Sequence, residues 1–522
     1  MKLSKIFFLP VLVFMSSATY AQDLFKTDDI YAIKSVSLSD VSHDGSSLIF
    51  ITGQADKKED NFNNTLYFLD LKSGKKEVLL QSKGGRGLSF SSVKFSGDSK
   101  SIYFLSSGYK ASGKNNTQVW SLNLSNRIKR RLTNYEGNIS DYDISKDGST
   151  IAFIGNKKSE DQDKTKTPSP IVIDRYQFKR DYEGFLGNDR DHLFVFNTKS
   201  RKTRQITSGQ RDHSYPSISP DGKSIAYVTK EGDFDRHNNW DIFIKNIEDS
   251  GDVKRLTFHD GPDSSPDAGS RPQWSPDGTK IAYIYGGEHS MLWYALNEVS
   301  VLDVETGETD FVTKVFDRNT YMPKWSENGE KLYFILEDNM KSQLVEYSFT
   351  DKTFEKITPE NIYLSWYSSN YYVAGDQLIY QSSTVTTPDE IYLSKNGEIN
   401  PITSVNKDFI ENKIVGSTEL ISFQSFDGLK INGMMIKPDD FDPKKKYPLI
   451  IRIHGGPVSQ YGRYFDFDWQ LFASNGYIVM VTNPRGSSGR GFEFQKSIFA
   501  EWGIEDSKDI SAALDFALSL GY

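Results

Sequence analysis

The sequence predicts a seven-bladed β-propeller followed by the first part of an α/β domain. Three observations support this fold class. An Asp-Gly turn motif recurs through residues 24–408, and a second strand-turn-strand motif follows each copy. After residue 409 the hairpins give way to alternating strands and helices. A chain of 522 residues also exceeds the roughly 250–300 residues that one hydrophobic core organises, so at least two domains are expected.

The first repeated motif is a polar turn, usually Ser-x-Asp-Gly, that leads into a short apolar strand. Asp-Gly pairs supply the positive φ angles that tight hairpins need. The clear copies are centred on Asp44, Asp98, Asp147, Asp221, Asp277 and Asn328, and a degenerate copy lies at residues 375–380.

The second motif is a strand, a polar turn and a further strand. Most of its copies end on a threonine. Its copies span residues 66–80, 119–133, 193–207, 242–257, 299–313, 344–358 and 391–403. The two motifs together make about four strands in roughly 50 residues, which is the size of a propeller blade. We therefore expect seven blades in residues 22–408, with the first motif as the inner hairpin and the second as the outer one.

One interval in this repeat, from Asp147 to Asp221, is longer than the others. We expect an insertion there, between the third and fourth units, and long insertions are often functional. Arg175, Arg180 and Glu183 in this segment are candidate ligand-binding residues that would face a cavity between the domains. The alternative is a disordered surface loop over 157–168 followed by an ordinary strand.

The first 21 residues have the layout of a secretory signal peptide. Lys2 and Lys5 precede an apolar run from Ile6 to Met15, and small residues lead to a cleavage site after Ala21. A membrane anchor is the alternative, but a span needs roughly 20 apolar residues. The sequence therefore predicts export to the periplasm or the medium, with no membrane attachment after cleavage.

Composition excludes several functions. The formal net charge is −8 and no basic cluster stands out, so nucleic acid is not an expected partner. The chain has no cysteine, which rules out disulfides, thiolate catalysis and cysteine-ligated zinc. Propeller histidines such as His192 and His213 lack metal-ligand spacing. We expect no metal and no cofactor, and the sequence leaves the oligomeric state open.

Residues 409–522 carry the strand and helix pattern of an α/β domain. Residues 421–426 and 431–436 predict a hairpin, 447–453 and 477–482 predict strands buried on both faces, and 469–475 and 507–520 predict helices. His454-Gly455-Gly456-Pro457 directly follows the first buried strand. Glycines at a strand end let backbone N–H groups approach a substrate oxygen, as in the oxyanion loop of α/β-hydrolases. A plain glycine turn is the alternative.

The order of these motifs resembles the prolyl oligopeptidase family of serine peptidases. The similar segments are residues 425–433, His454 to Pro457, residues 483–489 and residues 502–510. The nearest branch is that of acylaminoacyl-peptidases and bacterial dipeptidyl-peptidases. The resemblance implies a Ser-Asp-His triad that hydrolyses short peptides, with the oxyanion held at His454, Gly455 and Gly456. Independently of the resemblance, the charged insertion suggests that Arg175, Arg180 or Glu183 grips a peptide terminus in the cavity between the domains.

The nucleophile motif Gly-x-Ser-x-Gly is absent from the sequence, and His454 is the only histidine after residue 289. The triad would therefore lie beyond residue 522, and the chain as written should not catalyse alone. We expect an incomplete sequence rather than a truncated gene product, because half of a parallel sheet is a poor folding unit.

Several alternatives stay open. Arg485 either binds substrate or forms a buried ion pair with Asp506 or Asp509. Asp466 and Asp468 are expected to be solvated charges. Instead of a peptidase, the chain can be a binding protein that works through its propeller, an inactive truncated product, or an esterase. Exopeptidase and endopeptidase activity are not distinguished.

Overall fold

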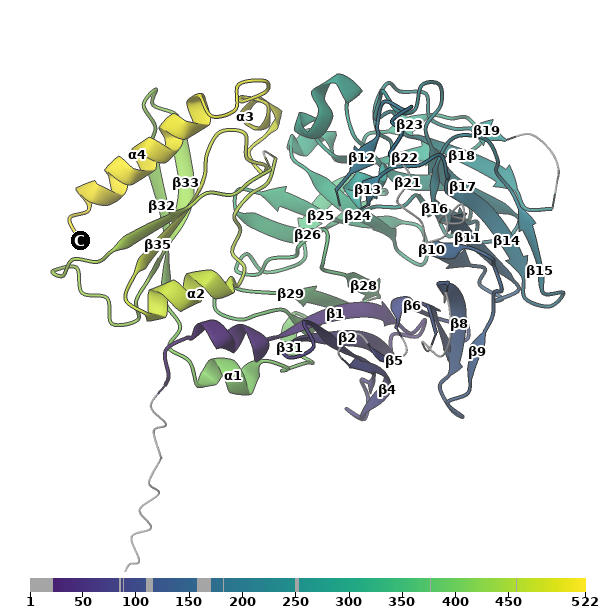
Figure 1. Ribbon diagram of the computed structural model, residues 1–522, viewed down its shortest axis with the longest axis horizontal. Coiled ribbons are helices and arrows are strands. Elements are labelled where there is room, and N and C mark those ends of the chain that lie inside the picture. The colour runs from purple at the N-terminus through teal and green to yellow at the C-terminus, as the bar shows by residue number, and fades with distance from the viewer. Residues whose placement is uncertain are drawn as a thin grey trace, which may run out of the picture.

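The computed structural model describes residues 22–83, 86–87, 89–108, 116–156, 170–181, 183–248, 253–375, 377–456 and 458–522. The predicted signal peptide, residues 1–21, and the polar run 157–169 lie outside the described residues. The rest forms seven antiparallel sheets around a common axis and a separate mixed sheet with helices (Figure 1). The fold class predicted from the sequence is confirmed.

Each blade is a four-stranded antiparallel sheet whose strands run outward in chain order, and the first blade has a fifth strand. Blades 1 to 3 are β1 (Lys34–Val41), β2 (Ser47–Asp56), β3 (Asn61–Asp70), β4 (Lys76–Lys83) and β5 (Arg86–Gly87); β6 (Ser91–Phe95), β7 (Ser101–Ser106), β8 (Gln118–Asn123) and β9 (Lys129–Arg131); and β10 (Asn138–Ile144), β11 (Thr150–Asn156), β14 (His192–Asn197) and β15 (Lys202–Gln205).

Blades 4 and 5 are β16 (His213–Ile218), β17 (Ser224–Thr229), β18 (Asp241–Asn246) and β19 (Lys254–Arg255); and β20 (Gln273–Trp274), β21 (Lys280–Tyr285), β22 (Glu298–Asp303) and β23 (Thr309–Asp310). Blades 6 and 7 are β24 (Thr320–Trp325), β25 (Lys331–Asp338), β26 (Lys341–Ser348) and β27 (Thr353–Lys356); and β28 (Tyr371–Ala374), β29 (Gln377–Ser382), β30 (Glu390–Lys395) and β31 (Glu398–Pro401). Short 3-10 helices lie at η1 (Thr27–Tyr31), η2 (Pro266–Ala268), η3 (His289–Tyr294) and η4 (Lys314–Phe316).

The Ser-x-Asp-Gly motif forms the turn between the first two strands of a blade. In blade 1, the Ser42 hydroxyl donates to Asp44 Oδ1 over 2.7 Å and accepts from the Ser47 N–H over 2.9 Å, while Gly45 takes φ +67°. The copy in blade 3 is built alike, and the hydrogen bond from Ser145 lowers the pKa of Asp147 to about 2. The repeat therefore encodes a turn whose polar groups hydrogen-bond to one another.

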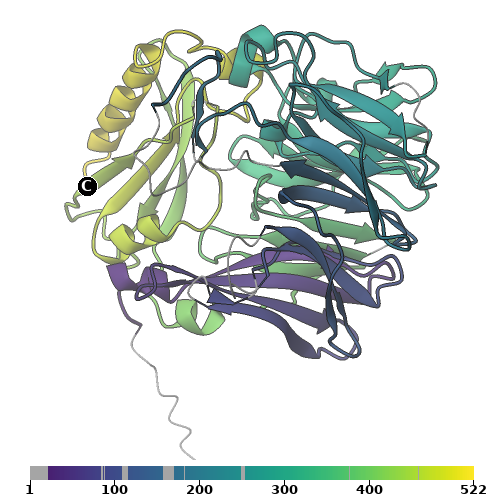
Figure 2. The same cartoon turned by 45° about the vertical axis from the view of Figure 1, so that its right-hand side comes forward.

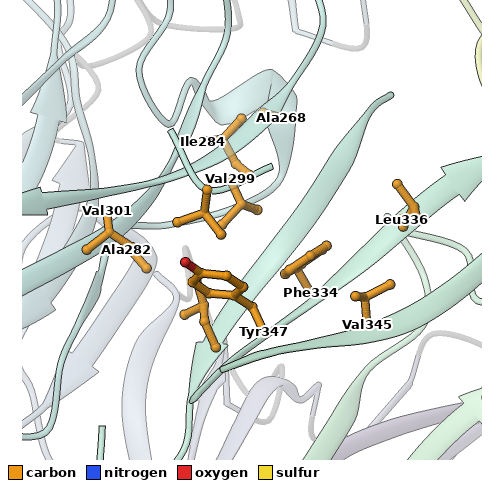
Figure 3. Close-up of a cluster of buried hydrophobic side chains, with 11 residues drawn as sticks. Ala268, Ala282, Ile284, Val299, Val301, Phe334, Leu336, Val345 and Tyr347 are labelled. Carbon is orange, nitrogen blue, oxygen red and sulfur yellow. The ribbon is translucent and has the colours of Figure 1, made fainter. Parts of the chain in front are cut away.

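Neighbouring blades pack through apolar side chains on their facing surfaces. Between blades 5 and 6, Ile284 and Val299 meet Phe334 and Tyr347 in one buried cluster (Figure 3). Strands such as β25 alternate apolar residues on both faces because each blade is covered by a neighbour on either side. This repeated contact supplies the propeller with its core.

The ring closes without a strand shared between blades 1 and 7. Closure depends on side chains of blade 7 and its approach segment. Asn370 Nδ2 donates to the Leu38 and Ser39 carbonyls over 3.3 and 3.2 Å, and the Leu38 N–H donates to Gln381 Oε1 over 3.1 Å. Val36 and Leu38 also pack against Ile379 and Ile391 in one cluster.

Polar side chains around the axis link the inner ends of the other blades. Arg271, just before β20, pairs with Asp141 of β10 over 2.7 Å and donates to the Pro216 carbonyl over 3.0 Å. Lys324 of β24 donates to Asn370 Oδ1 and the Tyr371 carbonyl, both over 2.7 Å. Burial lowers the pKa of Lys324 to about 8. Arg271 therefore links blade 5 to blades 3 and 4, and Lys324 links blade 6 to blade 7.

The long insertion lies inside the third blade rather than between blades 3 and 4. It separates β11 from β14 and includes the small hairpin of β12 (Lys179–Arg180) and β13 (Gly184–Phe185). The spacing of one motif gave the number of extra residues but not which connection holds them, so the expected position was wrong.

The α/β unit is a four-stranded sheet in the order β32-β33-β35-β34. Its elements are β32 (Ser417–Gln424), β33 (Lys430–Lys437), β34 (Leu449–Arg452), α2 (Phe467–Ser474), β35 (Ile478–Asn483), α3 (Phe492–Gln495) and α4 (Glu505–Ser519), and α1 (Lys407–Glu411) precedes it. Helix α2 packs on one face and α4 on the other. Figure 2 shows this unit beside the propeller.

Two details of this sheet differ from the sequence-based expectation. Only β34 and β35 are parallel, because the β32–β33 hairpin adds antiparallel strands. Strand β34 lies at the edge of the sheet, and its residues are partly exposed instead of buried on both faces. An apolar run alone does not tell a central strand from an edge strand.

The chain segment before the first blade lies against the α/β unit. Asp23 forms a parallel bridge with Lys413, and the Phe25 N–H donates to Ser474 Oγ of α2 over 3.1 Å. Lys413 Nζ also pairs with Asp29 over 2.7 Å. The chain therefore enters and leaves the propeller at the same place.

We expect Arg271→Met to destabilise the propeller by about 3 kcal/mol, because Asp141 would keep its charge near the axis without a cation. The urea-unfolding midpoint measures this change. Lys57→Met removes an exposed ion pair with Asp28 and should leave the midpoint unchanged. Equal midpoints for both variants would contradict a structural role for the axial contacts.

Candidate active site

The loop that follows β34 is held by its own histidine. His454 Nδ1 lies 2.9 Å from the Gly455 carbonyl oxygen, and Nε2 lies 2.9 Å from Ser487 Oγ. Burial lowers the pKa of His454, which favours the neutral imidazole. The Ser487 hydroxyl donates its one proton to the Pro484 carbonyl over 2.6 Å, so it accepts from His454 Nε2–H. His454 thus braces the loop.

The next two residues present free backbone donors. Gly455 and Gly456 are exposed, and no hydrogen bond within the described part of the chain uses their N–H groups. Gly456 has φ +148°, and a Cβ atom there would lie 2.8 Å from the Val458 nitrogen. A side chain at this position would therefore push the backbone. A glycine-dependent loop with free N–H groups is suited to binding a negatively charged oxygen.

Contacts to the propeller fix the chain just after this loop. Gln460 Oε1 accepts from the Met340 N–H over 2.9 Å, and the Asn339 N–H donates to the Gly489 carbonyl over 2.8 Å. Asn483 exchanges two hydrogen bonds with the Tyr461 backbone, at 2.8 and 2.9 Å. The turn between β25 and β26 in blade 6 therefore holds two loops of the α/β unit, the one after β34 and the one after β35.

Arg485 forms the buried ion pair that was one of its two alternatives. Its guanidinium donates to both oxygens of Asp509, Nε to Oδ2 over 3.0 Å and Nη2 to Oδ1 over 2.9 Å. Asp509 on α4 is fully buried and also accepts from Ser425 Oγ. Asp427 lies 3.1 Å away and Glu505 3.6 Å away. The partner is Asp509 rather than Asp506, and the network joins the β32–β33 turn, the loop after β35 and α4.

Asp466 is not the solvated charge expected from the sequence, whereas the side chain of Asp468 is half exposed as expected. Asp466 Oδ1 caps α2 by accepting from the Trp469 N–H over 3.1 Å, and burial raises the pKa of Asp466. Asp468 pairs with Arg452 of β34 over 3.1 Å. Both residues hold α2 in place, a role that the polar loop sequence did not reveal.

No hydrogen bond or ion pair among the described residues joins the three insertion residues to this loop. Arg175 is about nine-tenths buried and pairs with Asp235 of blade 4 through two contacts of 2.5 and 3.0 Å. Arg180 and Glu183 pair with each other over 2.8 Å across the β12–β13 hairpin and are half exposed. Their role in substrate binding stays a prediction.

A cavity of 250 Å³ lies between blades 6 and 7 and the loop after Gly456. Its lining includes Glu337 at the end of β25, Asp389, and Gln460 and Ser488 of the α/β unit. The sequence analysis missed these residues. One signal was present: Glu337 continues the alternation of Tyr333 and Ile335 on a strand buried on both faces, where an acid is unusual.

Two kinds of feature are absent from the described residues. None of their helices combines the length and the apolar character that a membrane span requires. No three or more of their His, Asp and Glu side chains gather in a way that would hold a metal ion.

The arrangement of propeller and α/β unit matches solved peptidase structures. The acylaminoacyl peptidase of Pyrococcus horikoshii superposes with a TM-score of 0.77 at 22% identity, over 95% of this chain and 73% of that one. An acylaminoacyl peptidase in complex with Z-Gly-Gly-Phe-chloromethyl ketone gives 0.78 at 22% identity, with the same coverage. The fold is therefore that of a β-propeller joined to part of an α/β-hydrolase domain.

Sequence comparisons support the resemblance to the prolyl oligopeptidase family. Residues 463–522 match the Prolyl oligopeptidase family. The uncharacterized peptidase YuxL of Bacillus subtilis is 27% identical over 95% of this chain and 76% of its own length. Dipeptidyl-peptidase 5 of Porphyromonas gingivalis is 28% identical over 59% of this chain, which spans 44% of that protein. Over residues 463–522 the chain therefore matches the family that its motifs predicted.

If Arg485 is structural, Arg485→Met should lower the unfolding free energy of the α/β unit by about 3–5 kcal/mol, because Asp509 would stay buried and uncompensated. Urea unfolding measures the loss. The double variant Arg485→Met/Asp509→Leu should regain much of it, since both charges are gone. A single variant as stable as the parent would return Arg485 to the substrate-binding candidates.

Proposed function

We propose that this chain is the propeller and the oxyanion-loop part of an exported serine peptidase that hydrolyses short peptides. The observation that carries the proposal is the pair of free N–H groups at Gly455 and Gly456, on a loop braced by His454 and clamped by blade 6. The match to the family supports hydrolysis of a peptide bond by a Ser, Asp and His triad of the complete protein.

In this proposal the loop acts by stabilising charge. When a serine attacks the peptide carbonyl, negative charge develops on the carbonyl oxygen, and preorganised N–H donors lower the energy of that state. His454 serves the loop and not proton transfer, because both of its ring nitrogens already have partners within it and Ser487. The base is therefore expected to be a different histidine.

The restriction to short peptides rests on the position of the propeller, whose blades 5 and 6 contact the loops around the site. Export rests on the sequence of the first 21 residues. Cleavage after Ala21 is tested by sequencing the N-terminus of protein recovered from outside the cytoplasm; an uncleaved Met1 would contradict it.

Gly456→Ala should reduce kcat about 10²–10³-fold with little change in KM, because the new Cβ moves the loop backbone away from the developing oxyanion. The assay uses the product of the complete coding sequence and chromogenic peptides. Gly187→Ala is the matched control, since its Cβ would meet no atom within 4 Å. A Gly456→Ala enzyme with full kcat would exclude this loop from the oxyanion site.

A fluorophosphonate probe should label that same product on a serine, and prior treatment with a peptide chloromethyl ketone should slow the labelling. Mass spectrometry identifies the labelled residue. If the product is not labelled while its propeller still binds peptides, the binding-protein alternative replaces the peptidase proposal.

A further inference from the structure

A second cavity, of 570 Å³, lies at the axis of the propeller, at the end of the ring that points away from the α/β unit. Blades 1, 3, 4, 5, 6 and 7 all contribute to its lining. Its rim includes Pro220, Pro276 and Glu327, which lie in turns between the first two strands of a blade. The turn between β25 and β26, which holds the α/β unit, lies at the opposite end of these strands. The volume is within the roughly 300–1,000 Å³ of pockets that take small molecules.

Two indole rings form apolar walls of this axial cavity. Trp274 ends β20 and Trp325 ends β24, and both side chains are partly exposed. The indole N–H of Trp274 donates to the Ser217 carbonyl of blade 4, and that of Trp325 donates to the Gln273 carbonyl of blade 5, each over 3.0 Å. Because the indole N–H groups are used between blades, the rings offer carbon surface in fixed orientations to a ligand.

One lysine of the lining has an unused hydrogen-bond donor. Lys324 Nζ donates to Asn370 Oδ1 and to the Tyr371 carbonyl, both over 2.7 Å. The ring of Tyr371, whose centroid lies 4.6 Å from Nζ, adds a cation–π contact but no hydrogen-bond acceptor. An ammonium group has three N–H bonds, so one of them remains for a ligand.

The acids near the axis leave Lys324 without an ion pair. Asp143 pairs with Lys94 over 3.2 Å. Asp40 attracts Lys324 only from beyond ion-pair distance, and burial raises the pKa of Asp40, which favours its neutral form. No carboxylate of the described residues forms an ion pair with Lys324. A desolvated ammonium group without a paired carboxylate favours an anionic occupant.

We propose that the axial cavity binds a small organic acid, with its carboxylate on Lys324 and a flat apolar body against the indole rings. An inorganic anion would reach the lysine but would leave the rings in contact with water. A neutral aromatic molecule would cover the rings without a charge-assisted hydrogen bond. The proposal goes beyond peptidase activity, because the cavity opens at the end of the propeller away from the glycine loop and binding requires no turnover.

The protonation of Lys324 gives the site a pH dependence. Burial lowers the pKa of Lys324 to about 8, so the side chain loses its charge as pH rises from 7 to 9. A carboxylate binds the protonated lysine, and its affinity should therefore fall about tenfold over this range. The other titratable groups around the lysine or in the lining are Asp40, Lys94, Tyr333, Tyr371 and Tyr372, with His43, Lys146 and Glu327 at the rim.

Isothermal titration of the full chain with indole-3-acetate and with the neutral indole-3-acetamide tests the site. The acid stays ionised between pH 7 and pH 9, so a change in its affinity reports the protein. At pH 7 we expect at least about a tenfold preference for the acid, because the amide accepts only an uncharged hydrogen bond. Lys324→Met should remove this preference and flatten the pH dependence. Trp325→Leu should weaken acid and amide alike, because it removes a wall and keeps the cation.

Lys223→Met is the matched control. It alters an exposed lysine in a turn at the same end of the propeller and should bind the acid as the parent does. Far-ultraviolet circular dichroism checks that each variant is folded, and the pH profile of the parent tests the role of the lysine if Lys324→Met does not fold. Equal binding of acid and amide by the parent would overturn the proposal, as would parent-like binding by both folded cavity variants. Displacement of indole-3-acetate by an equal concentration of inorganic phosphate would also overturn it.

Discussion

The closure of the propeller ring is the constraint on which the rest of this structure depends. No strand crosses from blade 7 to blade 1, so the seam is held by Asn370, Gln381 and the apolar contacts of Val36 and Leu38. The axial pairs of Arg271 and Lys324 brace the ring from within. Only a closed ring places blade 6 at a fixed distance from blade 1, and both of these regions hold the α/β unit.

The candidate site is therefore a joint product of the two units. The α/β unit supplies the strand and the glycines, whereas the turn between β25 and β26 fixes the loops that follow through Asn339 and Met340. The cavity next to the loop likewise takes Glu337 from the propeller and Ser488 from the α/β unit. Neither unit alone would present the same arrangement of donors and charges.

The sequence revealed most of the fold and little of the site's surroundings. Turn chemistry is local, so Asp44 and Asp147 marked their hairpins and the blade count followed. The Arg485–Asp509 pair was one of two stated alternatives. Contacts between residues distant in sequence could not be predicted. Arg175 faces Asp235, and Glu337 faces Ser488, because of tertiary packing. The edge position of β34 depends on strand order, which an apolar run does not encode.

The segment from Asp23 to Tyr31 has a mechanical consequence. It contacts Lys413 and α2 at the point where the chain leaves the last blade, so this non-covalent attachment lies beside the covalent connection between the two units. The opposite contact, through blades 5 and 6, consists of hydrogen bonds and packed side chains alone. If the two units separate, the attachment at Lys413 and α2 acts as the hinge. The interface then opens first on the opposite side, beside Glu337 and the glycine loop.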